Sequence, residues 1–243
     1  NLAATDQMVD SPTNNFATLN PLTGTAIAFS EGNLKATKAA GSPYPTALST
    51  IAMHSGKFYF EAVSLTGNSS FGIMDTNATG ATYWHDSAST GYGGGYYYNG
   101  SFRSFGIGSV SYASTFTNGD VIGAALDLDA GTLTFYKNNV SQGVAVSGLT
   151  ATSTKGFFFG MSTENQNTVA NFGQDSSFAG NKTPQGNQDS NGIGDFYYAP
   201  PTGFLALCTA NLPDVDVIPS ENFNTVIYTG DGSADQSMTG VGF

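Results

Sequence analysis

Charge is scarce in this sequence of 243 residues. Only 10% of the residues are Asp, Glu, Lys or Arg, where soluble domains usually have about a quarter. Eighteen are acidic and seven basic, so the formal net charge is −11, and Arg103 is the single arginine. Nucleic acids and anionic membrane surfaces attract basic proteins. The composition therefore argues against nucleic acid as a partner and against binding to anionic membranes.

Cysteine, long apolar runs and helix-forming segments are also missing. Cys208 is the single cysteine, so no disulfide framework can form within the chain. No run reaches the roughly eighteen apolar residues of a membrane-spanning helix, and we expect no membrane insertion. Long stretches rich in Leu, Glu, Lys and Ala are absent, which argues against a helical protein. What the chain does have is 31 glycines, which suit a fold with many tight turns.

The stretch at 119–140, GDVIGAALDLDAGTLTFYKNNV, predicts a β-hairpin. Apolar side chains stand at alternate positions from 122 to 128 and again at 133 and 135, which is the period of a strand with one buried face. Asp-Ala-Gly at 129–131 interrupts the pattern, and glycine can take the positive φ that such a turn needs. We interpret this hairpin as scaffold.

Further strand-like runs follow one another with turn signals between them, as in a β-sandwich. The run GKFYFEAVSL at 56–65 has apolar bulk on both faces, which predicts a central strand with material packed on each side. The polar segment at 175–195 is interpreted as a long surface loop. The run at 203–212 resembles the one near residue 14, and we expect these two terminal strands to lie side by side in one sheet.

Several of these segments resemble the SPRY domain. They are the aromatic strand ending at Glu61, FGI at 71–73, GYGGGYYYNG at 91–100, the hairpin, and FFFGMS followed by VANFG, which together cover roughly 50–175. The flanks, DSPTNNFATLNP and PPTGFLALCTANLP, are similar to those around SPRY-like modules in structural proteins of tailed, notably marine, bacteriophages. The resemblance implies an all-β, concanavalin A-like sandwich of two antiparallel sheets. It also implies a virion protein.

Glucanases share a related sandwich, so catalytic groups were sought. Retaining glycosidases need two carboxylates about 5–5.5 Å apart. Glu61 has no acidic partner two or four residues away, and Asp129 is placed at a turn, where Asp bonds its own backbone. His54 and His85 are the only histidines, and there is no G-x-S-x-G elbow, Walker loop or Cys/His zinc pattern. We therefore expect no catalytic residue and no enzyme activity.

The segment DSNGIGD at 189–195 raises the question of calcium. Asp189, Asn191 and Asp195 place oxygen atoms at alternate positions with glycines for the bend, as a calcium loop does. The downstream bidentate glutamate of an EF-hand is missing, and Asp, Asn and Gly also make ordinary loops. The ordinary loop is favoured, and no metal or cofactor is predicted.

The best candidate for recognition is the aromatic region between residues 83 and 103. Such side chains combine stacking faces with hydrogen-bonding tips and are enriched at interfaces. Core or subunit packing is the favoured alternative for part of the cluster, because Tyr96 and Tyr98 should share one face of a strand. Trp84 is expected to be exposed. The candidate ligand-binding residues are Tyr83, Trp84, His85, Tyr92, Tyr96, Tyr98, Phe102 and Arg103.

The predicted organisation is an N-terminal tail at 1–11, a SPRY-like sandwich at 12–213 and a C-terminal arm, or the start of a further domain, at 214–243. The leading functional hypothesis is a non-enzymatic phage structural protein, a fibre, spike or head decoration, on the virion surface or otherwise extracellular. Its expected partners are other virion proteins, further copies of itself and a host-surface glycan or protein. The alternatives are a secreted lectin-like carbohydrate-binding module and, third, an enzyme of the glucanase type.

Overall fold

The computed structural model describes residues 10–11, 13–23, 26–38, 45–77, 93–104, 106, 108–164, 167–213, 227, 229–230 and 232. The chain divides into two units, Asn1–Asn211 and Leu212–Phe243. The described residues of the first unit form β-strands and a short 3-10 turn, η2 (Thr209–Asn211). Within the described residues no helix is long and apolar enough to cross a membrane.

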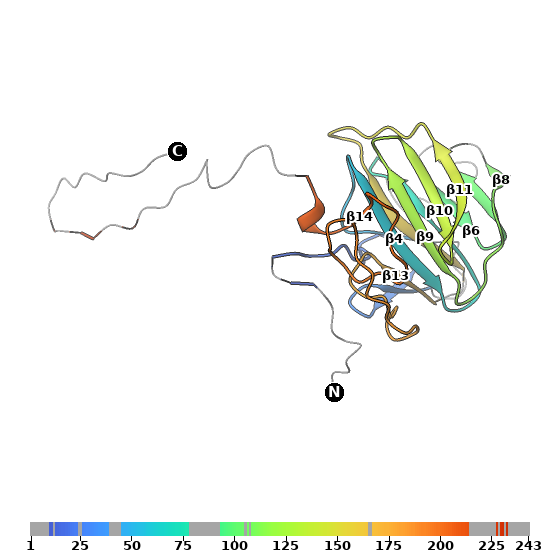
Figure 1. Ribbon diagram of the computed structural model, residues 1–243, viewed down its shortest axis with the longest axis horizontal. Coiled ribbons are helices and arrows are strands. Elements are labelled where there is room, and N and C mark those ends of the chain that lie inside the picture. Colours follow the sequence, from blue (N-terminus) through green and yellow to red (C-terminus); the bar gives the residue numbers. More distant parts are fainter. Residues whose placement is uncertain are drawn as a thin grey trace. The chain divides into compact units, whose positions relative to one another are not determined.

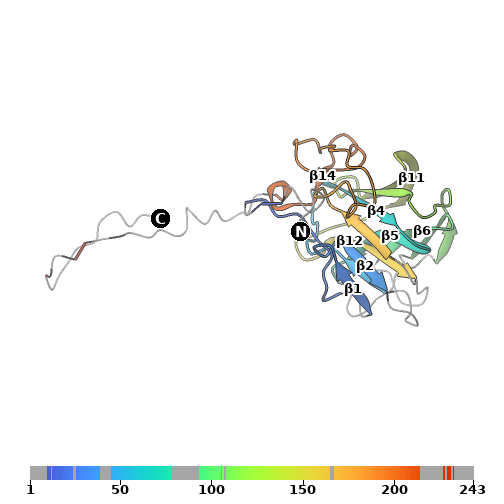
Figure 2. The ribbon, with the colours of Figure 1, turned by 90° about the horizontal axis from the view of Figure 1, so that it is seen from below.

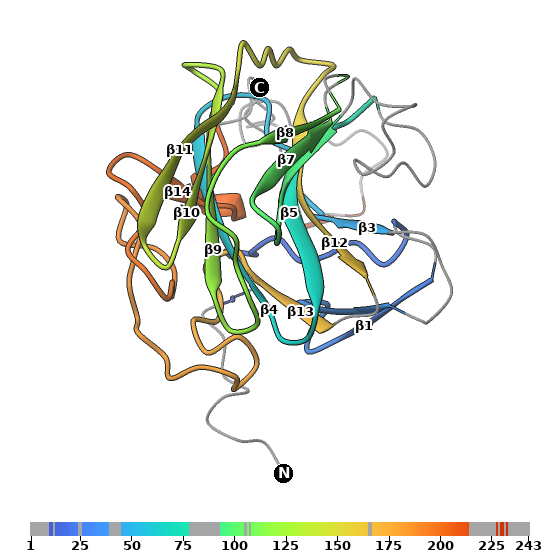
Figure 3. The same ribbon diagram turned by 90° about the vertical axis from the view of Figure 1, so that its right-hand side faces the viewer.

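Two sheets form the first unit, and Figures 1 and 3 show them as separate layers. The larger sheet has the order β1 (Ile27–Ser30), β2 (Lys35–Lys38), β13 (Asn167–Asn171), β4 (Lys57–Ser64), β9 (Val121–Asp127), β10 (Thr132–Lys137) and β11 (Val140–Ser147), with β14 (Leu205–Ala206) paired to β4. The smaller sheet has the order β3 (Thr46–Leu48), β12 (Phe157–Glu164), β5 (Asn68–Asp75), β6 (Gly93–Tyr97), β7 (Ser101–Ser104) and β8 (Ser109–Ser111). Neighbouring strands are antiparallel, except that β14 runs parallel to β4. The predicted sandwich of two antiparallel sheets is confirmed.

The main core lies between the sheets. Phe60 on β4 stacks on Phe159 of β12 with ring centroids 5.0 Å apart, and it also contacts Phe172 at 5.2 Å. All three rings are fully buried. Truncating a buried Phe to Ala typically costs about 3–5 kcal/mol, so this stack is a main source of cohesion between the layers.

The predicted hairpin is β9 and β10, paired from Asp127↔Thr132 to Ile122↔Lys137. The Asp127 carboxylate accepts hydrogen bonds from the backbone N–H groups of Asp129 and Ala130, at 3.0 and 2.8 Å. Gly131 has a φ of +65°. The turn lies where the sequence predicts, but Asp127 caps it, while the Asp129 carboxylate accepts the Gly56 N–H at 3.2 Å. The hairpin lies toward one end of the larger sheet, with β11 beyond it (Figure 1).

A second apolar cluster covers the outer face of the larger sheet. Tyr59 of β4 points to this side and packs edge-on against Phe196, with ring centroids 5.4 Å apart. Phe16, Ala125, Ala206 and Cys208 complete the buried cluster. The covering segment, defined here as residues 174–204, passes beside β14 and β4 and is drawn in orange-brown in Figure 2. The prediction of a surface loop at 175–195 is wrong for its first part, because residues 174–178 are buried.

The segments around residues 16 and 208 lie side by side, as predicted, but they meet in an isolated bridge and not as two strands of one sheet. Phe16 and Cys208 form an antiparallel bridge, and Thr209 donates its N–H to the carbonyl of Asn15 at 2.9 Å. Next to this bridge, β14 pairs with the first half of β4 and β13 with the second half. One edge of β4 is therefore shared by two strands from the C-terminal part of the sandwich.

Candidate functional site

Two of the predicted ligand-binding residues belong to the core. Tyr96 is fully buried, and its ring contacts Phe116 and Phe135 at centroid distances of 5.0 and 5.5 Å. Its hydroxyl donates to the backbone carbonyl of Ser114. Phe102, which pairs with Tyr96 across β6 and β7, is also buried. These two side chains hold the sandwich together and are not placed to contact a ligand.

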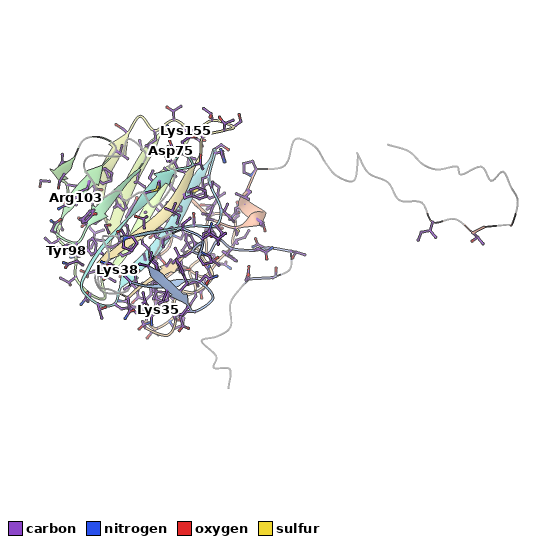
Figure 4. The ribbon with its side chains drawn as sticks, turned by 180° about the vertical axis from the view of Figure 1, so that it is seen from behind. Lys35, Lys38, Asp75, Tyr98, Arg103 and Lys155 are labelled. Carbon is purple, nitrogen blue, oxygen red and sulfur yellow. The ribbon has the colours of Figure 1, made fainter. Side chains whose placement is uncertain are left out.

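Tyr98 and Arg103 both pack beside Tyr97, on the other face of the smaller sheet. The Arg103 guanidinium carbon lies 4.7 Å from the centroid of the Tyr97 ring, within the range of a cation–π contact. Tyr98 packs, half-buried, against the cluster formed by Met74 and Tyr97. Figure 4 labels Tyr98 and Arg103 on the same side of the molecule. We call the three residues Tyr97, Tyr98 and Arg103 the recognition face. Tyr97 itself is buried, with 4% exposed, so of the three it is the half-buried Tyr98 and Arg103 that present surface to a partner.

The prediction that Tyr96 and Tyr98 share a face is wrong. Strand β6 ends at Tyr97, and the chain then turns, with the Gly100 N–H donating to the Tyr97 carbonyl. Gly100 has a φ of +83°, and an added Cβ there would lie 2.4 Å from the carbonyl oxygen of Ala113. Because Tyr98 belongs to this turn, strand alternation does not apply to it, and it packs with Tyr97.

Sequence reasoning missed Tyr97, although the pattern holds a signal for it. In the β6–β7 register Arg103 stands opposite Gly95, which has no side chain. The arginine can therefore reach diagonally to the next outward residue of β6, which is Tyr97. The remaining candidates, Tyr83, Trp84, His85 and Tyr92, lie outside the described residues.

Glu61 is the most buried carboxylate of the described chain, with no exposed surface. It accepts backbone N–H groups of Tyr197 and Tyr198 at 2.8 Å each, together with the Asn171 amide at 3.3 Å and the Tyr59 hydroxyl at 3.4 Å. Burial raises its pKa to about 7, and these hydrogen bonds oppose the rise. A carboxylate so enclosed ties the covering segment to the sheet and cannot reach a substrate.

The calcium candidates serve as internal anchors in the structure. Oδ1 of Asp189 accepts the backbone N–H groups of Asn191 and Ile193. Oδ2 accepts the backbone N–H of Ala206 and the side-chain amide of Asn211. Asp195 accepts the Gly186 N–H at 3.0 Å. Nowhere in the described part of the chain do three or more His, Cys, Asp or Glu side chains gather in a way that could hold a metal ion.

Comparison with known proteins agrees with this fold. Residues 57–175 match the family model of the SPRY domain, which confirms the resemblance seen in the sequence. The SPRY domain of human HERC1 superposes with a TM-score of 0.51 at 16% identity, over 63% of this chain and 96% of that one. The stonustoxin structure gives a TM-score of 0.50 at 20% identity, over 63% of this chain and 26% of that one. No curated protein matches the sequence.

The two solved structures show a likeness of fold, and the family model shows the match to the SPRY domain. SPRY domains are typically non-catalytic interaction modules, so the match indicates a binding module. The matched region ends at residue 175, and most of the covering segment lies beyond it.

Proposed function

With residues 57–175 matched to the SPRY domain, we propose that this protein is a non-catalytic module that binds a protein partner through its recognition face. The observation that carries the proposal is that the half-buried Tyr98 and Arg103 both pack against the buried Tyr97 on the outer side of the smaller sheet. Tyr and Arg are the residue types that most often dominate the free energy of binding at protein interfaces.

The recognition face is also preorganised. Tyr98 is held by its contacts with Met74 and Tyr97, and its own N–H donates to the carbonyl of Ser69 at 3.1 Å. The Arg103 guanidinium is held over an aromatic ring. Side chains that are partly fixed before binding lose less rotamer entropy when a partner arrives, which favours affinity.

The non-catalytic part of the proposal is supported by the acidic groups. The Glu61 oxygens are occupied by N–H and O–H donors inside the protein. Asp127 closes the β9–β10 turn and forms an ion pair with Lys57 at 2.9 Å. Among the described residues, no second carboxyl group is a hydrogen-bond partner of Glu61, and Asp129, which lies beside Asp127, accepts the Gly56 N–H at 3.2 Å.

For the biological setting we propose a virion-surface or extracellular protein of a tailed bacteriophage, acting in host attachment or particle assembly. Two features of the sequence support this: the flanking segments that resemble those of phage structural proteins, and a surface that relies on neutral hydrogen-bonding side chains instead of charge. The alternative is a secreted lectin-like module. The exposed part of an aromatic ring such as Tyr98 is a surface on which a sugar can stack, so the test must include glycans.

A peptide library displayed on phage, panned against the full chain, tests the proposed class of ligand. The affinity of an enriched synthetic peptide is then measured by fluorescence anisotropy on the wild type and on the Tyr98→Ala and Arg103→Ala variants. We expect each substitution to weaken binding at least about tenfold, equivalent to about 1.4 kcal/mol. Lys57→Ala is the matched control, because it removes an exposed cation from the other sheet, and it should change the affinity less than about twofold.

Two outcomes would contradict the proposal. Peptide binding that both recognition-face variants leave unchanged would place the site elsewhere. Saturable binding on a glycan array, lost in Tyr98→Ala and accompanied by no enriched peptide, would favour the lectin-like alternative.

A further inference from the structure

Both sheets end on one side of the sandwich. β8 is the last strand of the smaller sheet, and β11 is the last strand of the larger one. Tyr112, just after β8, donates its hydroxyl to the Gly143 carbonyl of β11 at 2.5 Å, and Ser114 donates its N–H to Gln142 Oε1 at 3.2 Å. Figure 3 shows β8 and β11 on the same upper side of the molecule. We call this side the β8–β11 edge.

The β8–β11 edge carries no charge over a long stretch. Residues 104–119 and 138–154 contain no Asp, Glu, Lys, Arg or His. Lys137 and Asp120 border it, and they neutralise each other in an ion pair of 3.3 Å. The rest of the chain therefore holds all of the net charge of −11.

Exposed apolar side chains gather on the same edge. Five large apolar side chains are exposed in the part of the chain that the structure describes, and three of them lie here. They are Val110, Val140 and Val144, with exposed fractions of 43%, 63% and 55%. Val140 and Val144 belong to β11, whose eight residues are mostly exposed.

An open strand edge of this kind is prone to pair with another strand. Proteins usually prevent such pairing with a Lys or Pro on the edge strand, or with bulges. β11 has neither Lys nor Pro. It has two register irregularities against β10, and Gly143, which lies within them, has a φ of +86°. These irregularities, and the Gly143 carbonyl that already accepts the Tyr112 hydroxyl, limit the length that can pair, but no charge opposes the approach of a second strand.

We propose that the β8–β11 edge is a self-association surface, on which β11 of a second copy pairs antiparallel with β11 and joins the two larger sheets. The charge distribution favours a second copy as the occupant. Two chains that each have a net charge of −11 repel one another where their acidic residues meet, and an uncharged surface avoids this repulsion. Antiparallel pairing of identical strands is two-fold symmetric, so it gives a closed dimer. The valines of both copies then cover one another.

The dimer is expected to be reversible. A single pair of short edge strands buries less than the roughly 1,200 Å² typical of stable interfaces, so dissociation in the micromolar range is expected. The recognition face lies on the outer side of the smaller sheet, on β6, the turn after it and β7, and this inference therefore does not depend on the proposed binding function.

Sedimentation velocity of the full chain, from low micromolar to several hundred micromolar, tests the proposal. We expect a monomer–dimer equilibrium whose dissociation constant rises at least about tenfold in Val144→Lys and in Val140→Lys, since a lysine on an edge strand opposes pairing. Leu22→Lys is the matched control: Leu22 is 93% exposed, lies in a turn away from this edge, and should leave the equilibrium unchanged. Hydrogen exchange of the β11 amides should become slower as the protein concentration rises in the wild type and in Leu22→Lys. In the two β11 variants it should not depend on concentration.

Three results would overturn the proposal. The first is a chain that stays monomeric at several hundred micromolar. The second is a dimer that neither β11 variant weakens. The third is a dimer lost in Ile227→Lys, a site in the second unit that is 98% exposed, while exchange of the β11 amides stays independent of concentration. Thermal unfolding of each variant shows whether the fold is intact, and peptide binding by the recognition face should persist in Val144→Lys.

Discussion

At the scale of single residues, Glu61 links the larger sheet to the covering segment. Its carboxylate meets two successive backbone N–H groups, those of Tyr197 and Tyr198, in a place from which water is excluded. The titratable groups nearest to it are the Tyr59 and Tyr198 hydroxyls, whose own pKa values are raised by burial. No ion pair of Glu61 with a cation is found among the described residues. Its ionisation therefore works against the fold.

Stability should fall as the pH rises from 4.5 to about 7. Burial raises the pKa of Glu61 from 4.5, the ordinary value that applies to the unfolded chain, to about 7 in the folded protein. The folded state therefore holds the proton more tightly. The resulting stabilisation is complete below pH 4.5 and is lost as the pH passes through about 7. The difference corresponds to about 3 kcal/mol in the free energy of unfolding. Urea unfolding across this range measures it.

The Glu61→Gln variant separates this group from the rest of the chain. Gln cannot ionise, so most of the pH dependence should disappear. Its single oxygen leaves one backbone donor unsatisfied, which costs about 1–3 kcal/mol at low pH. Glu31→Gln, on an exposed side chain, removes the same charge and should keep the wild-type pH profile. An unchanged profile in Glu61→Gln would show that another group carries the effect.

At the scale of elements, the covering segment depends on a few polar anchors. Asp189 gathers four N–H donors from three places in the chain: its own turn, β14 and η2. Asp175 similarly binds Ser177 and Ala179, and Asn171 connects β13 to Asp195. These contacts hold an irregular stretch, which has no strand or helix of its own apart from an isolated bridge between Asn187 and Phe196, against the larger sheet.

Replacing Asp189 by Ala should destabilise the protein by at least about 3 kcal/mol, because buried donors lose a charged acceptor. Differential scanning calorimetry measures the loss. Asp129→Ala is the control, since Asp129 lies exposed at the hairpin turn, and its cost should be much smaller. If added calcium raised the unfolding temperature of the wild type and not that of Asp189→Ala, Asp189 would be a metal ligand instead of an anchor.

The sequence allowed regular strands and turns to be predicted, but not the contacts of the covering segment with distant strands. The β9–β10 hairpin follows from alternation at 122–135 and an Asp-Ala-Gly turn, which are both local signals. The end of β6 was missed because it depends on the turn at Gly100. The contact of Arg103 with the Tyr97 ring was missed for the same reason. The covering segment was missed because Glu61 and Tyr197 are 136 residues apart in the sequence, and no local sequence pattern predicts a contact between them.

At the scale of the whole sandwich, chain entry and exit coincide. Asn14 accepts the Ala210 N–H at 3.1 Å, Thr209 bonds Asn15, and Cys208 pairs with Phe16. The chain thus enters and leaves the first unit at neighbouring points, and the strands between these points make up both sheets.

This arrangement decides how a mechanical load passes through the unit. In single-molecule pulling through Thr13→Cys and Ala210→Cys, the bonds of the terminal pair should open one after another at low force. Pulling through Thr13→Cys and Ser147→Cys, across the larger sheet, should require a clearly higher force; equal forces would contradict this. A tether attached at both ends would therefore peel the terminal pair before it strains the layers, and the strands that carry the recognition face would stay folded under tension.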